Sequence, residues 1–326
     1  MSPPSGADYP PNVAASGSSS GRVLAAARTL RVDATTAAVL RAFGAAGLRS
    51  IVLKGPTLQR ELYDDGSWRR YCDTDLLIAP VDLERAGGTL GELGFELAID
   101  HREHPGVCEP HAQEWSRAAG EERVDLHWRL AGAGAPAERA WRVLAARTHP
   151  IEVGAAAGEA LTRPGVALVV ALHAAQHGRT HRKPQRDLER ALERFGPSTW
   201  AAAGDLAEEL HAREAFAAGL RLSPAGAGMA RELGLPAVRS PQLRLMAGDQ
   251  PPGSFGMLRV LEAAGGRARL RAVRSELFPA PAFMRASSPL ARHGRMGLGL
   301  AYPARIAARA WRLPAAIRVV RESRAP

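Results

Sequence analysis

The sequence predicts an α/β (α+β) protein, in which a small mixed β-sheet flanked by helices is followed by a mostly α-helical part. Three observations indicate this fold. Short β-branched or alternating apolar runs occur within the first 150 residues. Segments with helical spacing of apolar residues lie between those runs. After residue 159 the helical spacing continues, while strand patterns become scarce.

The expected elements of the first half alternate between helix and strand. Residues 22–47 carry two apolar stripes at helical spacing, and residues 57–63 and 81–93 predict two shorter helices. Glycine or Asp-Gly turns follow several of these segments. Four strands are expected, at residues 50–54, 74–79, 95–99 and 123–130.

The second half is expected to be helical at residues 166–177, 185–195 and 200–222. Five prolines predict a broken helical segment near the C-terminus, at Pro279, Pro281, Pro289, Pro303 and Pro314. The expected organisation is a disordered N-terminus (1–21), an α/β domain (22–155), a helical domain (156–265) and a basic, proline-interrupted extension (266–326). The boundary between the two domains is expected near residues 148–162.

Composition limits the classes of protein that this sequence can encode. An apolar fraction of 46% in 326 residues is enough to form a sizeable core. No run of 18 apolar residues lacks a charge, so no transmembrane helix is expected. The Pro-, Ser- and Gly-rich start does not resemble a signal peptide and predicts disorder. With two cysteines, Cys72 and Cys108, we expect reduced thiols and a cytoplasmic protein.

The positive charge is concentrated at the C-terminal end. Residues 267–326 hold thirteen arginines against Glu276 and Glu322, a balance of +11, so 10 − 11 = −1 remains for the rest of the chain. Such a region indicates an anionic partner, such as nucleic acid, an acidic membrane surface or a phosphorylated ligand, or else a solvated basic face. An apolar stripe from Ile306 to Val320 favours packing on the protein, because Pro314 would interrupt a membrane-lying helix.

Three carboxylates are the main candidates for chemistry. Asp73 and Asp75 open an expected strand, and residues two apart on a strand point to the same face. Asp125 lies within a later strand. Carboxylate oxygens held close together suit Mg²⁺, and a third carboxylate from a neighbouring strand would complete a two-metal site.

A glycine turn is the second candidate feature. The expected strand that ends at Lys54 leads through Gly55 into a helix, which would bring backbone N–H groups close to phosphate oxygens. Lys54 could add its charge. Pro56 has no N–H to donate, so we expect the Thr57 hydroxyl to serve instead, and whether Pro56 impairs activity stays open. Arg69 is either a phosphate ligand or part of a solvated loop.

Several histidines are also candidates. His127 follows Asp125 by two residues and is expected on the same face, where it could contact an acceptor substrate or position a metal ligand. His173 and His177 lie one helical turn apart, either lining the cleft opposite the carboxylates or packing between helices. Four further residues are of types that bind zinc: His101, His104, Cys108 and His111. Prolines among them would break the helix that their spacing requires, so no zinc site is assigned to them.

These motifs together resemble the uncharacterised nucleotidyltransferase family, within the DNA polymerase beta-like nucleotidyltransferase superfamily. The matching stretches are LKGPTLQRELYDDGSWRRYCDTDLLI and VDLHWRL. They contain the family's leucine-lysine-glycine, tyrosine, arginine, Asp-x-Asp-Leu-Leu and Val-Asp-Leu-His-Trp, and the match covers roughly residues 35–200. The superfamily at large has Gly-Ser or Gly-Gly and a shorter spacing, whereas here sixteen residues separate Pro56 from Asp73.

The resemblance implies Mg²⁺-dependent transfer of a nucleotidyl group from a nucleoside triphosphate, such as ATP, to a hydroxyl or phosphate acceptor. The acceptor would be a small molecule or a peptide. The implied roles are metal binding and catalysis for Asp73, Asp75 and Asp125, nucleotide binding for Lys54, Gly55, Thr57 and Arg69, and acceptor contacts for His127, His173 and His177. Two alternatives are kinase-like phosphoryl transfer on the same fold, and a non-catalytic binding protein that uses the basic C-terminal region.

Overall fold

The computed structural model describes residues 19–65, 67–100, 102, 110–117, 121–248 and 253–324. Within these residues the strands form one seven-stranded sheet, in the order β3-β4-β5-β2-β1-β7-β6. The strands are β1 (Ser50–Val52), β2 (Thr74–Ile78), β3 (Glu96–Asp100), β4 (Ala112–Arg117), β5 (Glu122–His127), β6 (Thr148–Val153) and β7 (Ala156–Leu161).

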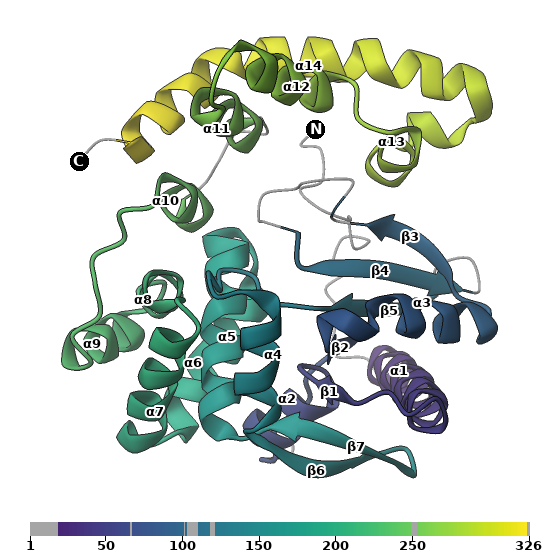
Figure 1. Cartoon of the computed structure of the whole chain (residues 1–326), viewed down its shortest axis with the longest axis vertical. Coiled ribbons are helices and arrows are strands. Elements are labelled where there is room, and N and C mark those ends of the chain that lie inside the picture. The colour runs from purple at the N-terminus through teal and green to yellow at the C-terminus, as the bar shows by residue number, and fades with distance from the viewer. Residues whose placement is uncertain are drawn as a thin grey trace.

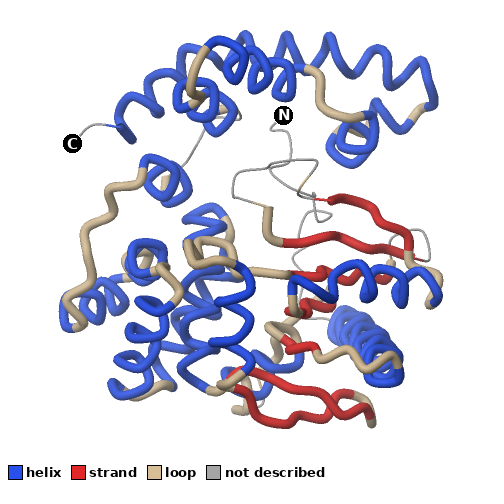
Figure 2. Tube along the Cα trace, in the orientation of Figure 1, coloured by secondary structure: helices blue, strands red, loops and turns tan. Residues whose placement is uncertain are grey.

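The sheet is mixed, as the sequence predicted. β2 pairs with β5 and β1 pairs with β7 in parallel, whereas β1 and β2 are antiparallel to each other. Every residue of β1 and β2 is buried, because helices cover both faces of the sheet at its centre. Figure 2 shows the strands gathered on one side of the molecule with helices around them.

Two hydrophobic cores lie on opposite faces of the sheet. On one face, the strand residues Leu76 and Leu126 share a core with Phe43 of α1 (Ser19–Ala45) and Leu90 of α3 (Leu83–Glu92). On the other face, Leu77 belongs to a larger core built with helices (Figure 1). These helices are α2 (Pro56–Leu62), α4 (Ala137–Ala145), α5 (Arg163–His177), α6 (Arg182–Arg194), α7 (Pro197–Glu209), α8 (Arg213–Leu220) and α9 (Pro224–Glu232).

The C-terminal helices form an arch at one end of the molecule (Figure 1). They are α10 (Pro241–Ala247), α11 (Ser254–Glu262), α12 (Gly266–Leu277), α13 (Pro281–Ser287) and α14 (Gly294–Arg324). Two small clusters hold the arch together, one around Leu245, Leu258 and Val320 and the other around Met284 and Ala301. No helix in the described part of the chain has the length and apolar character needed to cross a membrane.

The predicted interruption by prolines is confirmed at Pro279, Pro281 and Pro289, which lie between or at the starts of separate helices, and is wrong for the last helix. Prolines were expected to interrupt the last segment, yet α14 continues through Pro303 and Pro314. Both prolines are exposed, so the missing hydrogen bond and the displaced carbonyl of each lie on the water side of the helix. A helix accommodates proline there by bending, and α14 bows along the edge of the molecule (Figure 1).

The α/β class and the mixed sheet are confirmed, and the remaining differences are local. The expected helix over 200–222 is split into α7 and α8, because the chain reverses at His211, where φ is +53°. The hairpin β6–β7 falls on the expected boundary near 148–162 and joins the sheet through β7. The helix α1 starts at Ser19, so residues 19–21 are helical rather than disordered. The rest of the predicted disordered segment, 1–18, lies outside the described residues.

Candidate active site

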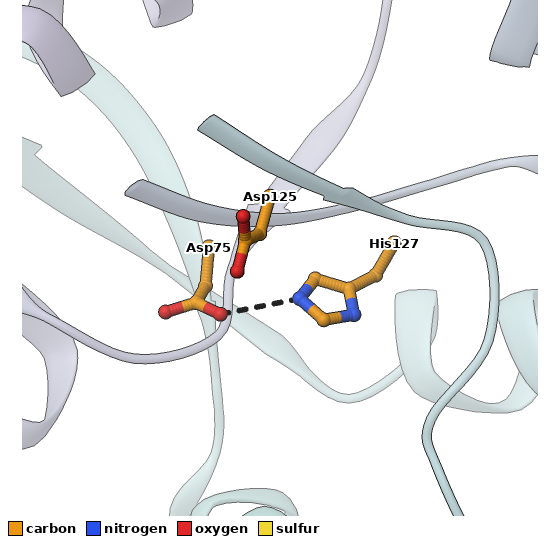
Figure 3. Close-up of side chains that lie close together, drawn as sticks. All are labelled: Asp75, Asp125 and His127. Carbon is orange, nitrogen blue, oxygen red and sulfur yellow. Dashed lines mark hydrogen bonds and ion pairs between the residues drawn. The ribbon is translucent and has the colours of Figure 1, made fainter. Parts of the chain in front are cut away.

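The register between two parallel strands brings the central carboxylates together. Asp75 on β2 is the direct partner of Asp125 on β5, and Leu77 is the partner of His127. Because neighbouring residues on a strand point to opposite faces, Asp75, Asp125 and His127 all project to the face covered by α5. One ligand atom from each of these three residues lies within 4.8 Å of the others (Figure 3).

Asp75 is the most tightly bound member of this cluster. Its side chain is 3% exposed, Lys54 Nζ lies 2.6 Å from Oδ1, and His127 Nε2 lies 3.1 Å from the same oxygen. Burial alone would raise the pKa of Asp75, but the charge of Lys54 and the hydrogen bond from His127 outweigh it, so the pKa lies well below its usual value. Asp75 is therefore a carboxylate in the folded protein.

Asp125 has the opposite electrostatic surroundings. Burial raises its pKa well above the usual value, and the negative charges of Asp75, Asp73 and Glu114 raise it further. Glu114 lies on β4 directly opposite Asp125, so three carboxylates stand side by side on β2, β5 and β4. Glu114 was not among the predicted site residues because β4 was not predicted: its sequence, AQEWSR, has no apolar alternation.

Asp73 lies just before β2 and is not a member of the close group of three. Its charge still acts on the site, because it raises the pKa values of both Lys54 and Asp125. Asp73 therefore adds negative charge to the site, and metal binding by Asp73 remains a prediction.

The glycine turn has a conformation that favours glycine. Gly55 has φ +57° and ψ −114°, and a Cβ at this position would lie 3.4 Å from the ring of Tyr71. Tyr71 is held in turn by a 2.6 Å hydrogen bond from its hydroxyl to Asp33 on α1. The Thr57 hydroxyl donates to the carbonyl of Val52 at 3.0 Å, and the side chain is 2% exposed. Thr57 thus fixes the turn, and phosphate binding by its hydroxyl remains a prediction.

Arg69 lies in a buried ion pair rather than in a solvated loop. Its guanidinium donates to both carboxylate oxygens of Asp187 on α6, with the shortest distance 2.8 Å. The two side chains are 3% and 1% exposed, and the Tyr63 hydroxyl adds a 2.7 Å hydrogen bond to Asp187. This network ties the loop before Asp73 to the helical half. A nucleotide contact by Arg69 remains a prediction.

The helix α5 brings a row of histidines to the same side of the sheet. His173 and His177 have ring centroids 4.5 Å apart, and His177 and His181 have centroids 5.0 Å apart. Burial, and then the charge of Lys54, lowers the pKa of His173 well below its usual value and that of His177 to about 3. These two histidines are therefore neutral and close enough to Lys54 to sense its charge.

A second link between α5 and the sheet runs through His111. Its ring stacks on that of His127 with centroids 5.7 Å apart, and its Nε2 lies 3.3 Å from Nε2 of Gln176 on α5. The sequence analysis considered His111 only as part of a zinc group, and did not predict this contact. The other residues of that group, His101, His104 and Cys108, lie outside the described residues.

This sheet, with paired carboxylates on adjacent parallel strands beneath a helix, has the arrangement expected of a metal-dependent transferase. The chain belongs to the uncharacterised nucleotidyltransferase family, whose model matches residues 6–225. That match covers the α/β part and the helices as far as α8, and ends at the start of α9, before the C-terminal arch. No curated protein matches the sequence.

Two solved structures resemble parts of the chain. One is the antibiotic-resistance factor ANT(2'')-Ia, with 13% identity and a TM-score of 0.37, over 58% of this chain and 94% of that one. The other is an antigenic nucleotidyltransferase-like protein from Paracoccidioides brasiliensis, with 14% identity and a TM-score of 0.35, over 56% and 92%. With TM-scores this low, the assignment rests on the family match.

Proposed function

We propose that this protein transfers a nucleotidyl group from a nucleoside triphosphate to a hydroxyl or phosphate acceptor, on a small molecule or a peptide, with Mg²⁺ as cofactor. The cluster of Asp75, Asp125 and His127 is the observation that carries the proposal. Membership of the nucleotidyltransferase family supports the reaction class.

The donor set fits a divalent cation. Buried Asp75 and half-buried Asp125 are partners on adjacent strands, and the pKa of Asp125 is raised first by burial and then by negative charge from Asp75, Asp73 and Glu114, which a cation would offset. Carboxylate oxygens are ligands that Mg²⁺ prefers. We propose Asp75 and Asp125 as the ligands of one ion, and Asp73 as the residue that would extend the set to a second. When bound, Mg²⁺ would stabilise the charge that develops on the phosphate oxygens.

We propose further roles for the residues around these carboxylates. In the proposed reaction the acceptor oxygen attacks the α-phosphorus, the bond from that phosphorus to the bridging oxygen breaks, and pyrophosphate leaves. Asp125 would also accept the proton of an acceptor hydroxyl, as a carboxylate within the proposed metal cluster. Lys54, anchored on Asp75, would contact the triphosphate, and Gly55 would let the backbone approach it. His127, His173 and His177 would face the acceptor.

The proposal predicts triphosphate binding that depends on both metal and carboxylates. Calorimetry with ATP, GTP, CTP and UTP should show Mg²⁺-dependent binding of at least one nucleotide, and EDTA should abolish it. Asp75→Asn or Asp125→Asn should weaken binding by at least the roughly 10- to 100-fold that is typical for loss of a group supporting a metal ligand. Asp205→Asn, which changes an exposed carboxylate on α7, is the matched control and should bind like the wild type.

Binding that survives EDTA, or that is equal in all three variants, would remove the basis for the proposed site. The products then separate transfer types. Nucleotidyl transfer releases pyrophosphate, whereas release of a nucleoside diphosphate would replace the proposal with kinase-like phosphoryl transfer. A protein that binds none of the four nucleotides, with or without Mg²⁺, would favour a non-catalytic role for the basic C-terminal region.

A further inference from the structure

The long C-terminal helix presents large apolar side chains to solvent. Met296, Leu300 and Trp311 on α14 are 83%, 59% and 87% exposed. They are four and eleven residues apart, so they share one face of the helix at 3.6 residues per turn. Ala304 and Ala307 lie on the same face and are exposed as well. We call these five residues the outer stripe.

The outer stripe is not the face by which α14 packs on the protein. The packing face contains Ala301, Ala316 and Val320, which are buried against the rest of the arch. Arg305 and Arg309 also turn inward, where each forms an ion pair with Glu276 of α12. Helix α14 thus has a second apolar face, and it lies along the outer edge of the molecule (Figure 1). Isolated exposed apolar residues are common, but a row of them on one helix face marks an interaction surface.

The surroundings of the stripe are strongly basic. Helices α12 and α14 together contain eleven arginines and two acids, Glu276 and Glu322. Glu276 is already matched by Arg259, Arg305 and Arg309. Arg318, Arg321 and Arg324 are exposed at the C-terminal end of α14. Arg318 follows Trp311 by seven residues, so the face that is apolar in its first half becomes basic in its second.

We propose that α14 docks on an anionic lipid bilayer, with the outer stripe inserted at the headgroup level and the arginines on the lipid phosphates. This inference is independent of the nucleotidyltransferase reaction, and the family match ends before the arch begins. Charge complementarity selects an anionic surface. Trp311 has the side chain that is favoured at a membrane interface.

A bilayer suits this face better than other anionic partners. The stripe is a single row of apolar groups of very different size, Met, Leu, Ala and Trp. A protein partner would need a complementary shape, whereas lipid headgroups and chains adapt to any row of side chains. Nucleic acid binding relies on donors to phosphate oxygens and would leave the apolar stripe in water.

Cosedimentation of the full chain with vesicles tests the proposal. The wild type should bind vesicles of phosphatidylcholine with phosphatidylglycerol, bind pure phosphatidylcholine far more weakly, and release from the anionic vesicles as salt is raised. Leu300→Ser/Trp311→Ser should lower the apparent partition coefficient by about tenfold or more, because two interfacial anchors are lost. Val81→Ser is the matched control, since Val81 is a large apolar residue, 84% exposed, in the 3₁₀ turn η1 (Pro80–Asp82).

The design keeps folding and binding separate. The substituted side chains are exposed, so each variant should keep the wild-type circular dichroism spectrum and melting temperature. A second variant, Arg318→Gln/Arg321→Gln/Arg324→Gln, should lose the preference for anionic vesicles. The proposal is overturned if the wild type stays in the supernatant, if it binds neutral vesicles equally well, or if Leu300→Ser/Trp311→Ser binds as the wild type does. A wild-type dimer that Trp311→Ser dissociates would also overturn it, since a second copy would then cover the stripe.

Discussion

Asp75 and Asp125 are direct partners on neighbouring strands, yet their surroundings shift their pKa values in opposite directions. Lys54 and His127 contact Asp75 and lower its pKa, whereas Asp125 is half-buried beside Asp75 and Glu114 and its pKa is raised. Such a division is typical of sites in which one carboxylate stays ionised and the other exchanges a proton. At the scale of single residues, opposite electrostatic surroundings thus distinguish two carboxylates on one face of the sheet.

The histidine row gives a prediction about pH. Burial, Lys54 and His181 lower the pKa of His177 to about 3, below the ordinary value of 6.5. Below pH 6.5 the imidazole of His177 is protonated in the unfolded chain but stays neutral in the folded protein. The free energy of unfolding therefore decreases as the pH falls from 6.5 toward 3. One such group costs about 1 kcal/mol at pH 5 after allowance for partial exposure. The melting temperature of His177→Gln should therefore fall less between pH 7.5 and pH 5 than that of the wild type.

The test compares the melting temperatures of two proteins that share all other titratable groups, so the contributions of those groups cancel. His149→Gln, on the edge strand β6, should follow the wild-type curve and serves as the control. Parallel curves for the wild type and His177→Gln would show that His177 titrates normally in the folded state.

Sequence spacing predicted only one property of the site residues, namely which side chains of a strand point to the same face of the sheet. The spacing of Asp73 and Asp75, and of Asp125 and His127, indicated shared faces because side chains alternate along a strand. The register that makes Asp125 the partner of Asp75 depends on contacts fifty residues apart, which no local pattern specifies. Glu114 was missed because the strand that carries it, β4, was not predicted at all.

At the scale of elements, a glycine sets the position of α10 on α5. Gly178 caps α5 with φ +61° and ψ −159°, a conformation that is essentially limited to glycine. A Cβ on Gly178 would lie 1.7 Å from the carbonyl oxygen of Met246 on α10. The backbone of α10 therefore approaches the end of α5 closely, next to His177 and the 3₁₀ turn η3 (Gly178–Thr180).

Gly178→Ala should destabilise the protein by about 3 kcal/mol or more, because backbone strain and overpacking against α10 act together. Gly94→Ala is the matched control. Gly94 also follows a helix and has φ +81°, but nothing lies within 4 Å of its Cβ position, so the expected cost is about 1 to 2 kcal/mol. Urea denaturation of both variants checks the difference. Equal losses would mean that α10 moves away at little cost.

Elements with strong local periodicity were predicted, and elements defined by their neighbours were not. The apolar pattern of α5 and the buried run of β2 are visible in the sequence. The hairpin β6–β7 was missed because β7 consists mainly of alanine, glycine and glutamate, residues that are depleted in strands; β6 and β7 pair along their full length with each other, and β7 joins them to β1. The prolines of α14 were misleading, because proline disrupts a straight helix but is accommodated in one that bends toward its packed side.

At the scale of the whole molecule, the sheet carries two extensive cores and the arch carries two small ones. The larger cores include residues from Ala37 to Leu235, while the clusters of the arch centre on Leu258 and Met284. The proposed site lies entirely among residues of the larger part. Nucleotide binding and membrane docking are thus proposed for different parts of the chain.

A chain truncated after residue 248 should separate these two properties. It keeps α10, which covers the end of α5, and removes α11 to α14. We expect an unchanged Mg²⁺-dependent nucleotide affinity, within about twofold, because the removed residues are remote from the carboxylates. Binding to anionic vesicles should disappear. Calorimetry and cosedimentation measure the two properties on the same preparation, and a truncated chain that still sediments with vesicles would contradict the assignment to α14.

The pairing of β2 with β5 also affects when the site forms during folding. Asp75 and Asp125 meet only after the chain between them, with α3, β3 and β4, has closed into a loop. The chain loses conformational entropy when a long loop closes, before the contacts between its ends can stabilise it. Strand pairs this far apart in the sequence therefore form more slowly than helices do. During synthesis or refolding, the chain would therefore acquire most of its helix content first. The ability to gather two carboxylates around a cation would come later, so a partly folded molecule would be inert toward nucleotide.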